Sequence, residues 1–227
     1  MKKSTTNTYF SIILVFLISW FTDSQVQAQS DTALFESQYL SNDFTAGSVK
    51  MKDGRTELAM MNYNKLTEEM IFVKDGARLA LDSLEMIDTV YIESRVFLPH
   101  EKVFYELLVK GPVSLFIQHK CNIVDAGNPS GYGGKTETGA ARSRSSFSNS
   151  VQTYRLKLPD GYHVLDATKF WITRINIFYK ANSRAQIIKV FPEKSKEIKQ
   201  FIKGKKLNLK NTDNLVTLIV KCNEFVR

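Results

Sequence analysis

Three histidines and two cysteines are the residues of this sequence that most often bind a transition metal. Their spacing matches no common zinc motif, because no HxH, HExxH or CxxC pattern occurs around His100, His119, His163, Cys121 or Cys222. A contact between His119 and Cys121, two positions apart, is the one local pairing that the spacing leaves open. We therefore expect neither a metal site nor a metal cofactor.

Gly134-Lys135-Thr136 resembles the end of a phosphate-binding loop, in which a lysine and a hydroxyl hold the phosphates of a nucleotide. The first glycine of that motif would fall at Pro129, and no strand–loop–helix pattern surrounds it. Glycine, serine and threonine are also what a flexible loop contains. We expect no nucleotide or other cofactor here.

Groups that could act as a nucleophile or as an acid–base pair are also present. Glu68 and Glu69 are adjacent, and Asp82 lies near Glu85, but neighbouring strand residues face opposite sides and loop carboxylates are normally solvated. Ser114 follows Gly-Pro in a hairpin turn and is not part of a Gly-x-Ser-x-Gly elbow. These patterns do not indicate catalysis, and we favour a protein that is not an enzyme.

The two cysteines lie in apolar patterns. Cys121 alternates with apolar residues of one strand, and Cys222 continues the apolar stripe of a helix. Buried free thiols are therefore the first interpretation. The alternative is a disulfide between Cys121 and Cys222, which an exported protein could form and which would fasten the end of the chain to a sheet.

The first 28 residues have the composition of an export signal. Lys2 and Lys3 precede an apolar run at residues 10–21, and Val26-Gln27-Ala28 is a small-residue cleavage site. The run is shorter than the roughly 20 residues that a spanning helix needs, which disfavours the alternative of an uncleaved membrane anchor. We expect cleavage after Ala28 and a mature chain, without a transmembrane segment, in the periplasm or outside the cell.

Residues 70–81 form the centre around which the mature chain is organised. Asp75-Gly76 joins two apolar-rich runs there, and these residue types suit a type I′ turn, which needs positive φ at both central positions. The turn would place Phe72 opposite Leu79. The sequence therefore predicts an antiparallel hairpin.

Further β-type segments surround this hairpin, with turn signals between them at short spacing. They occupy residues 47–52, 58–63, 86–97, 103–109, 113–124, 151–158 and 170–179. No helical pattern separates them, so the sequence predicts an antiparallel meander that curls into a barrel or folds over as a sandwich. Residues 125–150 are rich in Gly, Ser and Thr, and we expect them to be a long flexible loop.

The last part of the chain changes to a helical period, which makes the overall class α+β, mainly β, with two or three short helices at the C-terminus. The expected helices are residues 185–191, a second that starts at Pro192 and ends before Gly204, and a third capped by Asn211 or Thr212. We divide the mature chain into a β domain at 29–181 and a basic helical tail at 182–227 that packs on the sheet.

The excess positive charge lies in this tail. The formal net charge is +8, and residues from Ala181 onward contain 11 Lys and Arg against 4 Asp and Glu, whereas residues 29–180 contain 18 of each. An exported protein rarely meets nucleic acid, so any partner of this tail would be an anionic envelope surface or another envelope protein. The sequence favours a solvated basic helix face, and binding to such a partner is the alternative. The candidate partner-binding residues are Tyr132, Lys135, Arg142 and Arg144 in the loop and Lys205 and Lys206 in the tail.

Three stretches carry a resemblance to known proteins. They are LAMMNYNKLTEEMIFVKDGARLAL, the GYGG…ETGA loop, and the tail FPEKSKEIKQFIKGKKLNLKNTDNLVTLIVKCNEF. Together they resemble exported, uncharacterised β-rich proteins of gram-negative bacteria that have a basic C-terminal helical segment and no known activity. The resemblance implies export and the architecture described above, and it supplies no catalytic residue.

These observations favour a non-enzymatic binding or structural module of the cell envelope, in which a rigid sheet presents the loop and the basic tail. The alternative is a carrier or enzyme whose strands close around a cavity for a small ligand, since a barrel of about 8 strands can hold one. An interior filled by side chains would favour the module, and a lined cavity would favour the carrier.

Overall fold

The computed structural model of this protein describes residues 38–125 and 162–226. The predicted central hairpin is confirmed: β3 (Glu69–Lys74) and β4 (Ala77–Ala80) pair antiparallel, with Phe72 opposite Leu79 and Lys74 opposite Ala77. Asp75 and Gly76 both have positive φ, at 51° and 75°. Local turn chemistry therefore sets the register of this hairpin, as expected for an Asp-Gly type I′ turn.

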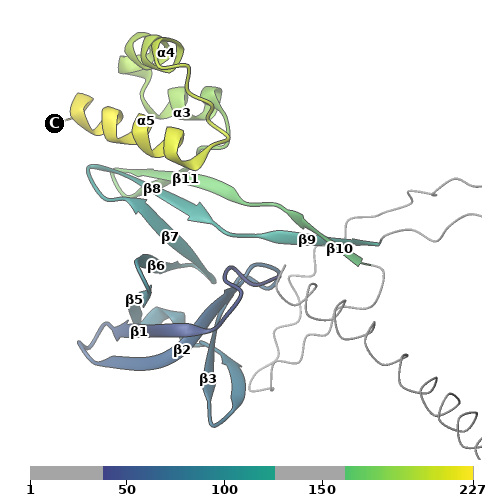
Figure 1. Cartoon of the computed structure of the whole chain (residues 1–227). Helices are drawn as coiled ribbons and strands as arrows, with labels where there is room; N and C mark the ends of the chain where they lie inside the picture. The colour runs from purple at the N-terminus through teal and green to yellow at the C-terminus, as the bar shows by residue number, and fades with distance from the viewer. Residues whose placement is uncertain (1–37, 126–161, 227) are drawn as a thin grey trace, which may run out of the picture.

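Ten antiparallel strands form one sheet in the order β12-β11-β8-β7-β6-β5-β1-β2-β3-β4 (Figure 1). The remaining strands of this sheet are β1 (Thr45–Met51), β2 (Thr56–Asn64), β5 (Ile87–Ile92), β6 (Arg95–His100), β7 (Val103–Val109), β8 (Val113–Gln118), β11 (Lys169–Arg174) and β12 (Ile177–Lys180). A single 3-10 turn, η1 (Leu84–Met86), precedes β5. Strands β9 (Cys121–Asp125) and β10 (Tyr162–Asp166) pair as a separate two-stranded sheet. The predicted antiparallel, mainly β class is confirmed.

Three predicted segments each contain two strands. Residues 86–97 include β5 and the start of β6, which are separated by a turn with Glu93 at φ 53°. Residues 113–124 divide at His119-Lys120 into β8 and β9, and residues 170–179 divide at Ile175-Asn176 into β11 and β12. The sequence predicts either one strand or a pair at residues 86–97, and the structure has the pair. The other two segments read as continuous because their turns lack the Gly or Pro that marks a turn in a sequence. The predicted strand at 151–158 and the loop, apart from Asp125 at the end of β9, lie outside the described residues.

Within the described residues the large sheet curls without closing, so the expected barrel is not formed by a continuous ladder. Strands β4 and β12 end the order and do not pair with each other. The curl nevertheless brings β3 into contact with β7, although four strands separate them in the order. The phenol of Tyr63 on β2 donates to the Phe104 carbonyl on β7 across 3.5 Å. An inner core fills the curl and consists of Val49, Met61, Tyr63, Met70, Ile87, Val90, Ile92, Phe97 and Phe104.

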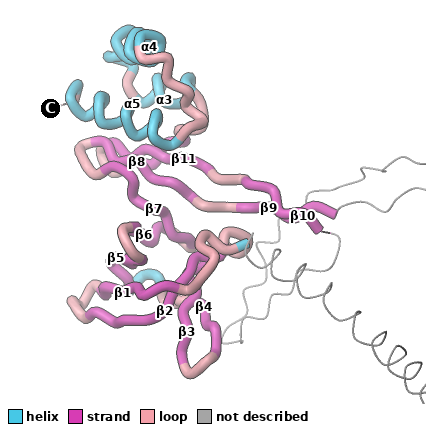
Figure 2. Tube along the Cα trace, in the orientation of Figure 1, coloured by secondary structure: helices cyan, strands magenta, loops and turns pink. Residues whose placement is uncertain are grey.

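Three helices follow the last strand and make a helix layer over the other end of the sheet (Figures 1 and 2). They are α3 (Arg184–Val190), α4 (Ser195–Gly204) and α5 (Thr212–Phe225), with a 3-10 turn, η2 (Pro192–Lys194), before α4. Ser183 caps α3 and Asn211 caps α5, each by accepting a hydrogen bond from a first-turn N–H. Gly204 is the last residue of α4, whereas the sequence placed it just past the end. No helix in the described part of the chain is long and apolar enough to span a bilayer.

A second core joins the helix layer to β8 and β11. Its buried members are Val113, Leu115, Ile172, Ala181, Ile187, Val190, Phe191, Ile198, Ile202, Leu215, Leu218, Ile219 and Cys222. The apolar stripe of α5 supplies the last four of these, as its i, i+3, i+4, i+7 spacing predicts. The helices are thus held against the sheet by a continuous apolar contact, which we call the helix-side core.

Candidate functional site

The most concentrated charge of the described chain lies on α4 and on the segment after it. Six exposed lysines, which we call the lysine surface, are Lys196, Lys199, Lys203, Lys205, Lys206 and Lys210. Ile198 and Ile202 anchor the opposite side of α4 in the helix-side core. Because these two anchors fix the rotation of the helix, the α4 lysines Lys196, Lys199 and Lys203 are exposed to solvent.

Three of the acidic residues in this part of the chain are paired with other cations. Glu193 accepts from Arg174 on β11 at 2.7 Å, and the hydrogen bond from that guanidinium lowers the pKa of the Glu193 carboxyl. Glu197 pairs with Lys194 at 3.4 Å, and Glu224 pairs with Lys221. None of the six surface lysines makes an ion pair within the described residues. Among the residues that the structure describes, the positive charge of this surface is therefore not balanced by ion pairs, and the exposed Asp213 on α5 is the acidic residue nearest to it in sequence after Lys210.

The structure places two of the six predicted partner-binding residues on this surface. Lys205 and Lys206 are exposed directly after α4 and lie next to the helix lysines in sequence. The four loop candidates, Tyr132, Lys135, Arg142 and Arg144, lie outside the described residues, as does the rejected Gly134-Lys135-Thr136 motif.

Both cysteines are free and buried. Cys121 packs with Leu66 and Ile123, whereas Cys222 belongs to the helix-side core, so the disulfide alternative is not formed. Burial raises the pKa of the Cys121 thiol to about 11 and that of the Cys222 thiol to about 12. Both thiols are therefore protonated at neutral pH, as is typical of buried structural cysteines and not of reactive ones.

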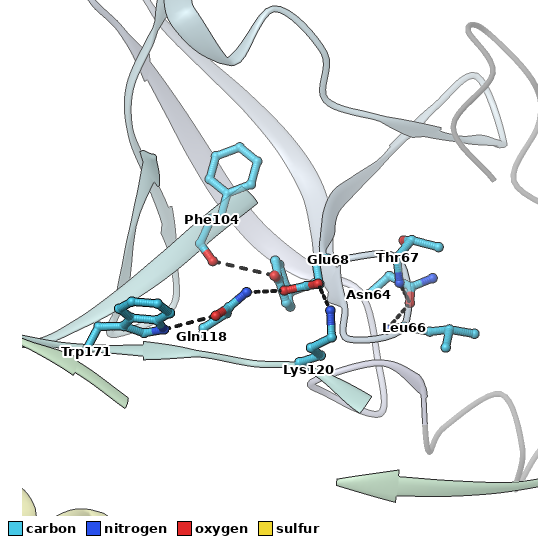
Figure 3. A network of polar contacts seen from close by, with 9 residues as sticks. Asn64, Leu66, Thr67, Glu68, Phe104, Gln118, Lys120 and Trp171 are labelled. Carbon is cyan, nitrogen blue, oxygen red and sulfur yellow. Dashed lines mark hydrogen bonds and ion pairs between the residues drawn. The ribbon is translucent and has the colours of Figure 1, made fainter. Parts of the chain in front are cut away.

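A polar network that the sequence did not reveal joins the turn between β2 and β3 to the junction of β8 and β9 (Figure 3). The Trp171 indole N–H donates to Gln118 Oε1 at 3.0 Å, and Gln118 Nε2 donates to Glu68 Oε1 at 2.5 Å. The ammonium of Lys120 pairs with the second oxygen of Glu68. We call these four residues the Glu68 network.

The β2–β3 turn is shaped to present Glu68 to this network. Asn64 Oδ1 accepts the backbone N–H groups of Leu66 at 2.9 Å and Thr67 at 3.3 Å. Glu68 itself has a positive φ of 61°, and the Lys65 carbonyl accepts the Cys121 N–H at 2.9 Å. The turn is therefore tied to β9 through the backbone as well as through the Glu68 side chain.

A second buried carboxylate lies nearby on the inner face of β7. Glu106 Oε2 is 2.5 Å from His119 Nε2 and 3.6 Å from Arg95 Nη1. The His119 ring also lies beside the rings of Tyr63 and Phe97. His119 therefore contacts Glu106 and the inner core, and the pairing with Cys121 that the spacing left open has no counterpart here.

These clusters correct one expectation from the sequence. Glu68 was expected to be solvated together with Glu69, but it is only 6% exposed because the β2–β3 turn packs under β8 and β9. The polar residues Gln118 and Lys120 at the end of an apolar strand were the one available signal. Glu68 and Glu106 each bind side chains of the protein itself, and a basic side chain compensates the charge of each carboxylate. Ion pairs of this kind hold distant segments together, and we call this arrangement a structural clamp.

No group of His, Cys, Asp and Glu side chains in the described ranges could hold a metal ion. No protein-family model, curated protein or solved structure significantly matches this chain.

Proposed function

We propose that this protein is a non-enzymatic binding module of the cell envelope, exported behind the signal at residues 1–28, and that the lysine surface receives an anionic partner. The observation that carries this proposal is that six exposed lysines make no ion pair within the described residues and lie on, or shortly after, a helix whose opposite side is fixed in the helix-side core. Because the helix is already fixed on the sheet, its backbone loses little conformational entropy when the lysines bind a partner. Basic residues close to an anionic membrane contribute about 1 kcal/mol each.

The filled interior of the curled sheet favours the module over the small-ligand carrier. The members of the inner core are at most 5% exposed, and large side chains such as Tyr63, Phe97 and Phe104 occupy the centre. We infer that β7 to β3 form a partly open barrel that is packed like a protein core. Such an interior supports the sheet as a scaffold.

Vesicle co-sedimentation tests the proposal directly. The mature protein is mixed with vesicles of phosphatidylglycerol and phosphatidylcholine, or of phosphatidylcholine alone, at low and at physiological salt. We expect binding only to the anionic vesicles, weakened by salt and by Lys205→Glu/Lys206→Glu. The matched control is Lys52→Glu/Lys74→Glu, which makes the same charge change at exposed positions directly after β1 and at the end of β3, two strands that do not belong to the helix-side core.

Two results would overturn the proposal. If binding changes neither with the salt concentration nor in either double variant, the lysine surface is only solvated. Equal losses in the two double variants would show that net charge, and not this surface, controls binding.

Export is tested separately by the intact mass of the secreted protein. We expect a chain that begins at Gln29, because the small-residue cleavage site ends at Ala28. A mass that still includes residues 10–21 would contradict the export part of the proposal.

A further inference from the structure

The turn between β11 and β12 exposes an isoleucine in an unfavourable backbone conformation. Ile175 has a φ of 52° and is 83% exposed. A β-branched residue in the left-handed region is a genuine outlier, because its side chain crowds the backbone. Ile175 therefore lowers stability through its conformation and gains nothing from burial. Strain of this kind is most often kept where it serves a function.

Two further exposed residues of β12 extend this apolar feature. Ile177 is 54% exposed and Tyr179 is 36% exposed. They alternate along the edge strand, so both side chains lie on the same face. Together with Ile175 they make a protruding apolar element, which we call the hairpin tip.

The hairpin tip borders the most basic part of the chain. Every charged residue between Lys169 and Lys210 is basic except Glu193 and Glu197, and both of these are paired. Helix α3, which carries the exposed Arg184 and Lys189, packs beside β12.

Arg174, the residue before Ile175, fixes the hairpin to the helix layer. Its guanidinium donates to the Val190 carbonyl at 2.6 Å and pairs with Glu193. The tip and the basic helices therefore form one rigid unit, in which apolar and positively charged groups are exposed together.

We propose that the hairpin tip inserts into the headgroup region of an anionic lipid bilayer while the surrounding lysines and arginines contact the lipid phosphates. This inference rests on the proposed function and identifies its partner as a membrane surface. The binding of a peripheral protein to a membrane strengthens with the apolar area that enters the interface and with the attraction of basic residues to anionic lipids, and this unit exposes groups of both kinds. An acidic protein or glycan would complement the charge but would leave an exposed isoleucine in a strained turn without a role.

Leu58 on β2 provides the matched comparison within the same chain. It is 82% exposed, nearly the same as Ile175, but it follows Glu57 and belongs to the part of the chain where basic and acidic residues balance. Six strands lie between β12 and β2 in the sheet order, so the two positions are far apart along the sheet. An effect at Ile175 that is missing at Leu58 would come from location and not from exposed hydrophobicity alone.

Labelled variants give the direct test. Ile175→Cys and Leu58→Cys are each coupled to a polarity-sensitive nitrobenzoxadiazole dye. The native thiols should stay unlabelled because both are buried and their pKa values are raised to about 11 and about 12. With anionic vesicles we expect a blue shift and quenching by a lipid-borne quencher at position 175 only. A protein that binds the vesicles with no spectral change at position 175 would overturn the insertion.

A second variant separates insertion from folding. Ile175→Asn replaces the strained residue by one that tolerates the left-handed region, so its thermal midpoint should equal or exceed that of the wild type. Its affinity for anionic vesicles should fall at least several-fold, whereas Leu58→Asn should bind as the wild type does. Unchanged affinity in Ile175→Asn would overturn the proposal.

The outcomes distinguish this inference from the proposed function. If the wild-type protein does not bind anionic vesicles, both the proposed function and the insertion inference are wrong. If binding is salt-sensitive and depends on Lys205 and Lys206 but not on Ile175, only the insertion fails. If Ile175→Asn instead abolishes self-association in analytical ultracentrifugation and leaves lipid binding intact, the tip is a contact between copies through the β12 edge, and the membrane inference is wrong.

Discussion

Asn223 on α5 pairs with Val113 on β8 through both groups of its side-chain amide. Its Oδ1 accepts the Val113 N–H at 2.8 Å, and its Nδ2 donates to the Val113 carbonyl at 2.9 Å. The two residues are 110 positions apart in sequence, and both are buried. A side chain thus completes the backbone pairing of the first residue of β8 and joins the last helix to the sheet.

We expect Asn223→Ala to destabilise the protein because it leaves a buried N–H and a buried carbonyl without partners. The cost should be about 1 to 3 kcal/mol for each unpaired group. Urea denaturation measures this loss in the free energy of unfolding. The control is Asn214→Ala on the same helix, because the Asn214 side-chain amide donates only to the exposed backbone carbonyl of Asn208. Equal losses in the two variants would show that the amide pairing contributes little.

The Glu68 network should contribute more to stability than an exposed ion pair. Lys120→Met leaves the buried Glu68 carboxylate without its cation, and we expect a loss of about 3 to 5 kcal/mol. The control is Lys50→Met, whose partner Asp88 is 45% exposed and whose loss should stay below about 1 kcal/mol. A double-mutant cycle with Glu68→Gln measures the coupling, and a coupling near zero would contradict the clamp.

The helix-side core should depend strongly on Leu218. Its side chain is fully buried, so Leu218→Ala should cost about 2 to 5 kcal/mol through lost burial and the cavity left behind. Val220→Ala on the same helix is the control, because Val220 is 48% exposed and alanine is the better helix former. Chemical denaturation compares the two, and a small loss at Leu218 would mean that α5 docks weakly.

We expect a substitution at Gly76 to lower stability because of the backbone conformation there, and not because a side chain would lack space. A Cβ atom would meet nothing within 4 Å at either Gly76 or Gly204, but only Gly76 has a positive φ, at 75°. We therefore expect Gly76→Val to cost about 1 to 3 kcal/mol and Gly204→Val to cost much less. Denaturant midpoints compare the variants, and similar midpoints would contradict a turn held by its φ angles.

The buried thiols should make stability decrease at alkaline pH. An unfolded cysteine loses its proton near pH 9, whereas Cys121 and Cys222 keep theirs up to about 11 and about 12 in the folded state. The folded state then binds more protons, so this contribution is fully present below about pH 9 and is lost as the pH rises through the folded pKa values. Unfolding curves from pH 8 to pH 11 should show the decrease, and Cys222→Ala should reduce its slope.

Thiol labelling gives an independent check on the same residues. At pH 8, both cysteines should react with an aromatic disulfide reagent only in denaturant. Rapid labelling of the native protein would mean that the thiols are accessible.

Local chemistry in the sequence was sufficient to predict the elements that depend on neighbouring residues. The Asp75-Gly76 turn, the cap at Asn211 and the apolar stripe that buries Leu218 were all predicted correctly, because backbone φ preferences and side-chain periodicity act within a few residues. The turn at Ile175-Asn176 was missed, since its first residue contradicts those preferences.

Only the tertiary structure decided how distant segments combine. Glu68 looks like a loop carboxylate in the sequence, and it becomes a buried anion because the chain folds Gln118 and Lys120, 50 and 52 residues away, onto its turn. The same holds for the open curl of the sheet and for the exposure of Ile175 beside basic helices. Contacts of this kind depend on the position of every intervening strand, which no local pattern of residues specifies.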